Sequence, residues 1–128
     1  MQPLLGSQEL MAFAATRDPE TAKAFYRDKL GLKFLYDDGF AVVFDANGTT
    51  LRIQKVKEVA GAQYTVLGWE VSDIAAKVAE LAKAGVKFEN FGLPDQDQSG
   101  IWTAPGGVAK VAWFKDPDGN TLSLSQHT

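Results

Sequence analysis

The sequence of 128 residues predicts an α+β fold in which a strand–helix–strand–strand–strand unit occurs twice. Three features appear in both halves: a capped amphipathic helix, an apolar run ahead of it, and a glycine-containing turn between two later apolar runs. The matching segments lie about 55–70 residues apart, which is too far for a solenoid and indicates a duplicated fold. We expect one domain over residues 1–128, with repeat units at about 9–56 and 64–126.

The two predicted helices follow the same plan. Asp18 and Asp73 are suited to cap the first turns, and each is followed by apolar residues at helical spacing. Gly31 and Gly85 suit the left-handed residue that commonly ends a helix, and an apolar-Lys-Phe entry into a strand follows each glycine.

The predicted turns also match. The stretch "FDANGTTLRI" (Phe44–Ile53) parallels "FKDPDGNTLSL" (Phe114–Leu124), and both place short polar residues and a glycine between strand-like runs. We therefore interpret Asp116 and Asp118 as turn residues and not as catalytic carboxylates or metal ligands.

Composition excludes several classes of function. The net charge of −3 and the lack of a Lys/Arg cluster argue against a nucleic-acid partner. The absence of cysteine excludes disulfides, thiolate metal sites and cysteine nucleophiles. The first residues resemble no signal peptide and no run is long enough for a membrane span, so we expect a soluble, cytoplasmic protein without a membrane partner.

Three motifs occur in order along the chain: "AFYRDKLGLKF" (Ala24–Phe34), "WEVSDI" (Trp69–Ile74) and "WFKDPDGNTLSL" (Trp113–Leu124). With these motifs the chain resembles the vicinal oxygen chelate superfamily, which includes glyoxalase I, bleomycin resistance proteins and extradiol dioxygenases. The resemblance covers about residues 9–126. It implies two βαβββ modules forming a mixed eight-stranded sheet curled around a cavity, and a homodimer.

The resemblance also implies where a metal would be held in that cavity. The family's ligands come from the first and fourth strand of each module, and the corresponding positions here are Met11, Arg52, Val66 and Ser123. These side chains offer a divalent ion neither carboxylate nor imidazole, and a guanidinium repels one. We therefore expect no metal and no cofactor. We interpret the only histidine, His127, as a residue of a mobile tail.

Strand alternation predicts which side chains line the cavity. One face of each outer strand packs on a helix, and the other faces inward. The predicted apolar lining is Met11, Phe13 and Val66, and the predicted polar groups are Arg52, Gln54, Glu70 and Ser123. Such a surface is typical of small-molecule pockets.

Several of these residues have more than one interpretation. Arg52 and Glu70 either pair with each other, lie in a dimer interface, contact a ligand or act in catalysis. A desolvated Glu70 has a raised pKa and is then the best candidate for a general base, with Arg52 stabilising an oxyanion. Trp102 is either a lid over a ligand or a plug of the sheet, and we expect Trp113 in the core.

Three hypotheses for function follow. The first is a metal-free, homodimeric protein that binds a small organic molecule in the sheet cavity, as the drug-sequestering branch of the resembled family does. The second is a lyase, isomerase or dioxygenase of the same superfamily, either metal-dependent with unorthodox ligands or metal-free with Glu70 as base. The third is a dimeric interaction module whose cavity is filled by its own side chains.

Overall fold

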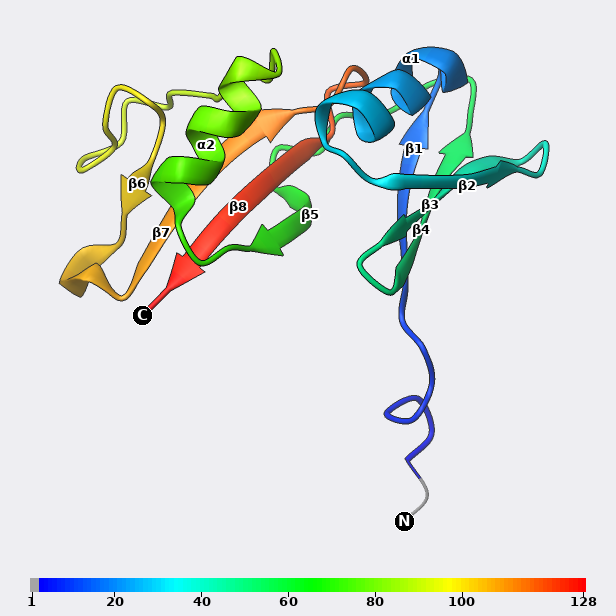
Figure 1. Ribbon diagram of the computed structural model, residues 1–128, viewed down its shortest axis with the longest axis horizontal. Helices are drawn as coiled ribbons and strands as arrows, with labels where there is room; N and C mark the ends of the chain where they lie inside the picture. Colours follow the sequence, from blue (N-terminus) through cyan, green and yellow to red (C-terminus); the bar gives the residue numbers. More distant parts are fainter. Residues whose placement is uncertain (1–2) are drawn as a thin grey trace.

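The computed structural model describes residues 3–128 and divides eight strands between two four-stranded sheets (Figure 1). The strand order is β1-β4-β3-β2 in the first module and β5-β8-β7-β6 in the second. In both sheets the outer strand β1 or β5 runs parallel to its neighbour, and the other pairs are antiparallel. The first sheet contains β1 (Met11–Thr16), β2 (Lys33–Asp37), β3 (Ala41–Ala46) and β4 (Thr49–Lys55). The second contains β5 (Thr65–Glu70), β6 (Trp102–Thr103), β7 (Ala109–Lys115) and β8 (Thr121–His127).

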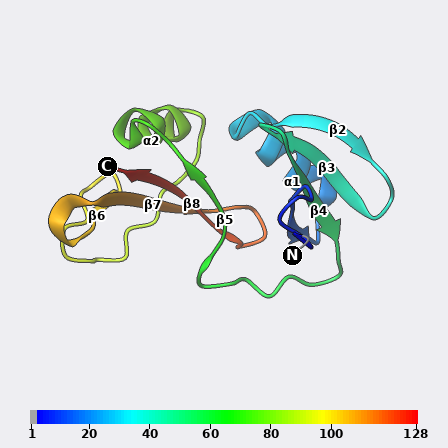
Figure 2. The same ribbon diagram turned by 90° about the horizontal axis from the view of Figure 1, so that it is seen from below.

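The predicted α+β class and the two βαβββ modules are confirmed. Within the described part of this chain the eight strands form two hydrogen-bonded sheets, and the edge strands β1 and β5 contact each other at the boundary between the modules. Figure 2 shows the linker after β4 crossing from the first sheet to the start of β5.

Each module carries one helix, and the predicted caps are present. The Asp18 carboxylate accepts a hydrogen bond from the Thr21 amide (3.2 Å) at the start of α1 (Pro19–Ala24). This helix continues as a π-helical turn, η1 (Phe25–Lys29). Asp73 caps α2 (Ile74–Lys83) in the same way. Gly31 and Gly85 follow the two helices with φ of 75° and 98°, a region that L side chains rarely adopt.

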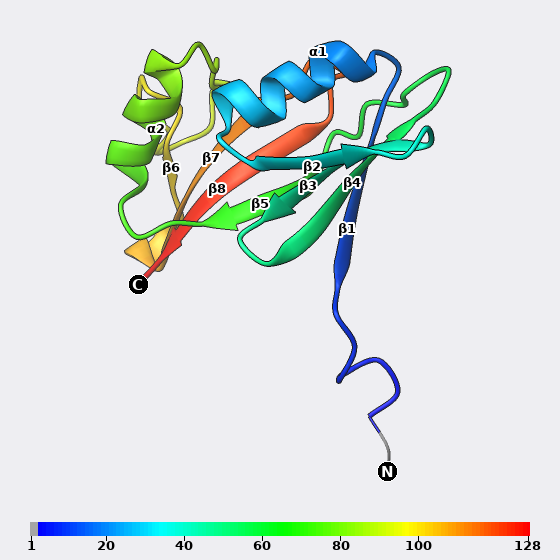
Figure 3. The same cartoon turned by 45° about the vertical axis from the view of Figure 1, so that its right-hand side comes forward.

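The core lies between the helices and the two sheets, and it is shared by both modules. Both helices lie along the same side of the sheets (Figures 1 and 3). The ring of Tyr26 packs on Phe44 of the first sheet with centroids 5.8 Å apart. The neighbouring Phe25 packs on Phe114 of the second sheet at 6.5 Å. The first helical segment therefore contacts strands of both modules, and burial of these rings stabilises their association.

The turn between β7 and β8 makes a polar connection between the modules. Asp116 is 5% exposed, and its carboxylate accepts hydrogen bonds from the Tyr26 hydroxyl (2.6 Å) and the Asn120 amide (2.7 Å). The Asn120 amide also donates to the Ala15 carbonyl (2.9 Å), and Asp118 accepts from the Arg17 amide (3.0 Å). Figure 3 shows this turn beside α1. The segment forms a turn, as predicted, and it also ties the second module to the first.

The second module departs from the repeat after its helix. A strand was expected directly after Gly85, but Phe88 makes only an isolated bridge to Phe114. The strand that occupies the edge of this sheet is β6, which lies further along the chain and is two residues long. Among the described residues, no helix is long and apolar enough to cross a membrane.

Candidate functional site

The first candidate surface is the face of the first sheet that points away from α1. Alternation along β1 packs Ala12 and Ala14 against the core and places Met11 and Phe13 on the opposite face. Met11 is 44% exposed and Phe13 is 48% exposed. The predicted alternation of this strand is therefore confirmed, and the lining of a cavity by both side chains stays a prediction. Two large apolar side chains that are partly exposed on one face of a strand suggest a binding surface.

Arg52 lies beside Phe13 on this face, because β1 and β4 pair these two residues. The guanidinium forms an ion pair with Asp38, with Nη2 and Oδ2 2.8 Å apart. Asp38 also accepts hydrogen bonds from the amides of Phe40 and Ala41. The Arg52 hydrogen bond and these two amides lower the pKa of Asp38 to about 2. Arg52 is thus held in place by the turn between β2 and β3, and it does not pair with Glu70.

The remaining residues of this face complete a row across the sheet. Tyr36, Val43, Arg52 and Phe13 are cross-strand neighbours, one from each strand. Gln54 lies two residues beyond Arg52, between Ala15 and Ala41, and its side chain is exposed. The first face therefore combines apolar rings with one fixed cation and one amide.

The second candidate surface is the corresponding face of the second sheet, and it is aromatic. The Trp102 and Trp113 rings have centroids 6.1 Å apart, and Phe91 packs edge-on against Trp113 at 5.6 Å. The prediction that Trp113 lies in the core is wrong, because Phe114 occupies the core and neighbouring residues of a strand face opposite sides. The repeat itself carried this signal, since Phe114 corresponds to the buried Phe44.

Ser123 lies at the centre of this second face. It pairs with Trp113 on one side and with Gly68 on the other, and it is 5% exposed. A Cβ atom on Gly68 would lie 3.0 Å from the Ser123 hydroxyl oxygen, so the missing side chain leaves room for this hydroxyl. The pair Gly68–Ser123 occupies the place that Phe13–Arg52 holds in the first module.

Val66 does not share the face of Gly68 and Glu70 as expected. The pairing of β5 with β8 is irregular between Thr65 and Leu67, which inserts one extra residue into the strand. Val66 occupies this bulge and packs against the core. Simple alternation fails here because the extra residue lets the neighbours Val66 and Leu67 both pack inward, while Gly68 and Glu70 keep the expected face.

Glu70 lies at the end of β5 and is paired with His127. Glu70 Oε1 lies 2.6 Å from His127 Nδ1, and Oε2 accepts the His127 backbone amide at 2.9 Å. These hydrogen bonds lower the pKa of Glu70, whose side chain is 56% exposed. The raised pKa expected of a desolvated general base is therefore not found. His127 is the last residue of β8 and pairs with Ala109, so its interpretation as a residue of a mobile tail is wrong.

The structure thus divides the predicted site residues into three groups. Met11, Phe13, Arg52 and Gln54 lie together on the first face. Ser123 and Trp102 lie on the second face, together with two aromatic residues, Phe91 and Trp113, that the sequence analysis did not assign to a site. Glu70 lies at a strand end, and Val66 packs inward.

The residues at the metal positions implied by the resemblance do not fit a divalent ion. Met11 offers a thioether, Ser123 a neutral hydroxyl and Val66 no donor at all. Arg52 places a cation there, held by its ion pair with Asp38. From residue 3 to residue 128, no cluster of three or more His, Cys, Asp or Glu side chains could hold a metal ion.

Comparison with known families and structures agrees with this architecture. The sequence model described as "Glyoxalase/Bleomycin resistance protein/Dioxygenase superfamily" matches residues 10–124. A search of curated proteins found no match.

Solved structures of several other proteins share the fold. A glyoxalase/bleomycin resistance protein from Catenulispora acidiphila is 24% identical, with a TM-score of 0.71 over 95% of this chain and 100% of that chain. The fosfomycin resistance protein FosX from Listeria monocytogenes is 14% identical, with a TM-score of 0.74 over 95% of this chain and 94% of that chain. A glyoxalase/bleomycin resistance protein/dioxygenase from Alicyclobacillus acidocaldarius is 18% identical, with a TM-score of 0.71 over 94% of this chain and 92% of that chain.

Proposed function

Because the chain belongs to the glyoxalase/bleomycin resistance protein/dioxygenase superfamily, we propose that it binds a small organic molecule on the sheet faces opposite the helices, without a metal. The observation that supports this most directly is the cluster of Phe91, Trp102 and Trp113 on the second face. Aromatic rings that are not used to bury a helix supply a large apolar contact area for a ligand. Arg52, Gln54 and Ser123 supply the few polar groups that orient it.

The proposed ligand lies between a first face and a second face, and we propose that a homodimer brings these together. In a single chain the two faces belong to separate sheets. The first face also leaves Met11, Phe13 and Tyr36 between 44% and 51% exposed, which is unfavourable in water. Placing the second face of another copy over these side chains would bury them and enclose a cavity lined by both faces.

Binding is favoured over the enzymatic hypothesis by the state of Glu70. An exposed carboxylate with a lowered pKa is a weak general base at neutral pH. Arg52, already paired with Asp38, has part of its charge neutralised before any oxyanion develops. If the protein nevertheless catalyses a reaction through Glu70, replacing this residue with glutamine will abolish it.

Ligand binding is tested by tryptophan fluorescence. The protein is titrated with fosfomycin, bleomycin and a panel of aromatic compounds. We expect saturable changes with at least one compound, and we expect Phe13→Ser to weaken that binding. Tyr64→Ser, in the exposed linker, is the matched control. Binding that Phe13→Ser leaves unchanged would exclude the first face from the site.

The proposed dimer is tested by native mass spectrometry of the same samples. We expect a dimer mass for the native protein and for Tyr64→Ser, and a shift toward monomer for Phe13→Glu, which places a charge in the proposed interface. A monomer that still binds ligand with full affinity contradicts the dimeric site but leaves the binding function in place.

A further inference from the structure

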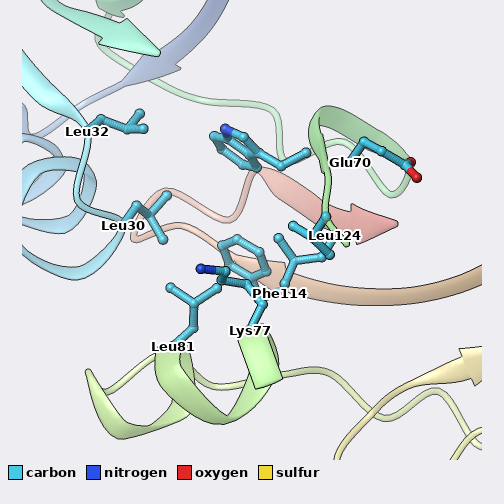
Figure 4. A pocket seen from close by; sticks show the side chains of 9 residues that line it. Leu30, Leu32, Glu70, Lys77, Leu81, Phe114 and Leu124 are labelled. Atoms are coloured by element: carbon cyan, nitrogen blue, oxygen red, sulfur yellow. The ribbon is translucent and has the colours of Figure 1, made fainter. Parts of the chain in front are cut away.

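A separate apolar cleft lies on the other side of the second sheet, between the two modules. Figure 4 shows it between Leu30 and Leu32 of the first module and Leu81, Phe114 and Leu124 of the second. Trp69 of the second module also lines it. These sheet residues face the helices, whereas Trp113 and Ser123 face the opposite side. The cleft is therefore distinct from the surfaces discussed above.

The size of the cleft restricts what it can hold. Its volume is about 170 Å³. An apolar cavity of about 150 Å³ stays dry and accepts a molecule the size of benzene. A stable protein interface needs about 800 Å² from each partner, far more than this cleft offers. Its dimensions therefore suit one aromatic ring or a short alkyl chain.

One charged group points into the cleft. Figure 4 shows the Lys77 ammonium directed toward the space between Leu30 and Leu81. Its ion pair is with Glu80, at 3.1 Å on the exposed surface of α2, and such pairs are weak. An ammonium has three hydrogen-bond donors, so it can donate to Glu80 and to a second acceptor at the same time.

Glu70, the acidic residue among those that line the cleft, does not compete for the Lys77 ammonium. Glu70 points away from the leucines in Figure 4, and its oxygens accept hydrogen bonds from His127. Lys77 is therefore the cation that lines the cleft, with part of its charge balanced by Glu80, and no lining carboxylate opposes an anion there.

We propose that this cleft binds a small hydrophobic carboxylate: one aromatic ring or a short alkyl chain that carries a single anionic group. The ring or chain fills the apolar space over Phe114, and the carboxylate accepts a hydrogen bond from the Lys77 ammonium. This site is independent of the ligand surface proposed above.

The test is a titration of the isotope-labelled full chain by ¹H–¹⁵N NMR with benzoate, benzyl alcohol and benzylamine. We expect saturable shifts at Leu30, Leu81 and the Trp69 indole, with benzoate binding tighter than benzylamine. Equal binding of all three probes would overturn the assignment of Lys77, and absence of saturable shifts at these residues would overturn the site.

Two variants separate charge from shape. Lys77→Met should weaken benzoate binding about threefold to tenfold, the loss of one partly exposed charge-assisted hydrogen bond, while benzyl alcohol binding persists. Lys83→Met, on an exposed position of the same helix, is the matched control and should change neither. An equal loss in both lysine variants would mean that only the overall charge of the helix matters, against the proposal.

Two further variants test the space itself. Leu81→Trp should fill the cleft and abolish benzoate shifts, while Leu81→Ala should admit the two-ring 1-naphthoate, which the native cleft is too small to take. The spectra report the fold of each variant directly. Phe13→Ser must leave benzoate binding unchanged, so failure of the proposed function and failure of this site give different results.

Discussion

The turns that join the last two strands of the two modules have similar sequences and different tasks. In the first module, Asp45 accepts a hydrogen bond from the Gly48 amide (2.8 Å) and stays within its own turn. In the second module, Asp116 makes the same kind of local bonds to the amides of Asp118 and Asn120, and also binds the Tyr26 hydroxyl across the module boundary. Both copies of the duplicated motif form a turn, and the second copy also connects the two modules.

The two sheet faces differ in a comparable way. The central pair on β1 and β4 is Phe13 and Arg52, while the equivalent pair on β5 and β8 is Gly68 and Ser123. The second module has its large side chain one strand further on, at Trp113, where the first module has Val43. Positions with large side chains on one face thus correspond to positions with small side chains on the other. This difference suits two faces that enclose one ligand.

The largest expected effect comes from removing the acceptor of the second turn. Asp116→Ala leaves the buried Tyr26 hydroxyl and Asn120 amide without this partner. We expect it to lower the free energy of unfolding by about 3 kcal/mol or more, and Asp45→Ala to lower it by about 1 kcal/mol or less. Urea denaturation of both variants measures the difference. Equal losses would show that the connection between modules contributes no more than an ordinary turn.

Tyr26→Phe sharpens the same comparison, because it removes the donor and leaves the turn intact. We expect a loss of about 1–2 kcal/mol at neutral pH. Burial and the neighbouring Asp116 raise the pKa of Tyr26, so the folded protein keeps the proton that the unfolded chain releases above about pH 10. The contribution of the Tyr26 hydroxyl to the free energy of unfolding is thus complete below pH 10 and declines as the pH rises further.

Denaturation of native protein and Tyr26→Phe at several pH values from 8 to 11.5 measures this contribution. The difference in stability between the two proteins should shrink above about pH 10. A difference that stays constant over this range would argue against a buried, protonated Tyr26.

A smaller effect is expected from the central pairs of the two faces. Gly68→Ala brings a methyl group within 3.0 Å of the Ser123 hydroxyl oxygen, which can rotate away. We expect a loss of about 0.5–1 kcal/mol in thermal or urea denaturation, at the low end of the cost of overpacking. Removing the hydroxyl as well, in Gly68→Ala/Ser123→Ala, should restore part of it. If the double variant is less stable than the sum of both single changes, this contact is not the cause.

The smallest effect concerns the ion pair of Arg52 with Asp38 on the first face, where the second face has Ser123 in the place of Arg52. The lowered pKa of Asp38 means that its contribution to stability is present above pH 4 and is lost as the pH falls from about 4 to about 2. Asp38→Asn should therefore approach native stability as the pH falls through this interval. A stability difference that is independent of pH would show that the pair is not maintained in solution.

The sequence by itself determined the elements that depend on near neighbours. Helix caps at Asp18 and Asp73, glycines after both helices and the alternation in β1 all follow from residues close in the chain, so local propensity was sufficient to predict them. The family resemblance followed from the order of three such motifs, and it is confirmed.

Only the tertiary structure decided the features that depend on distant partners. The bulge at Val66 and the pairing of Glu70 with His127 depend on how β5 aligns with β8, more than fifty residues away along the chain. The role of Asp116 depends on Tyr26, which no local pattern places beside it. The cleft of Leu30 and Leu81 likewise exists only because η1 packs across both sheets. Spacing in a sequence specifies which way a side chain faces within its helix or strand, but the packing of the two modules specifies which residues that side chain contacts.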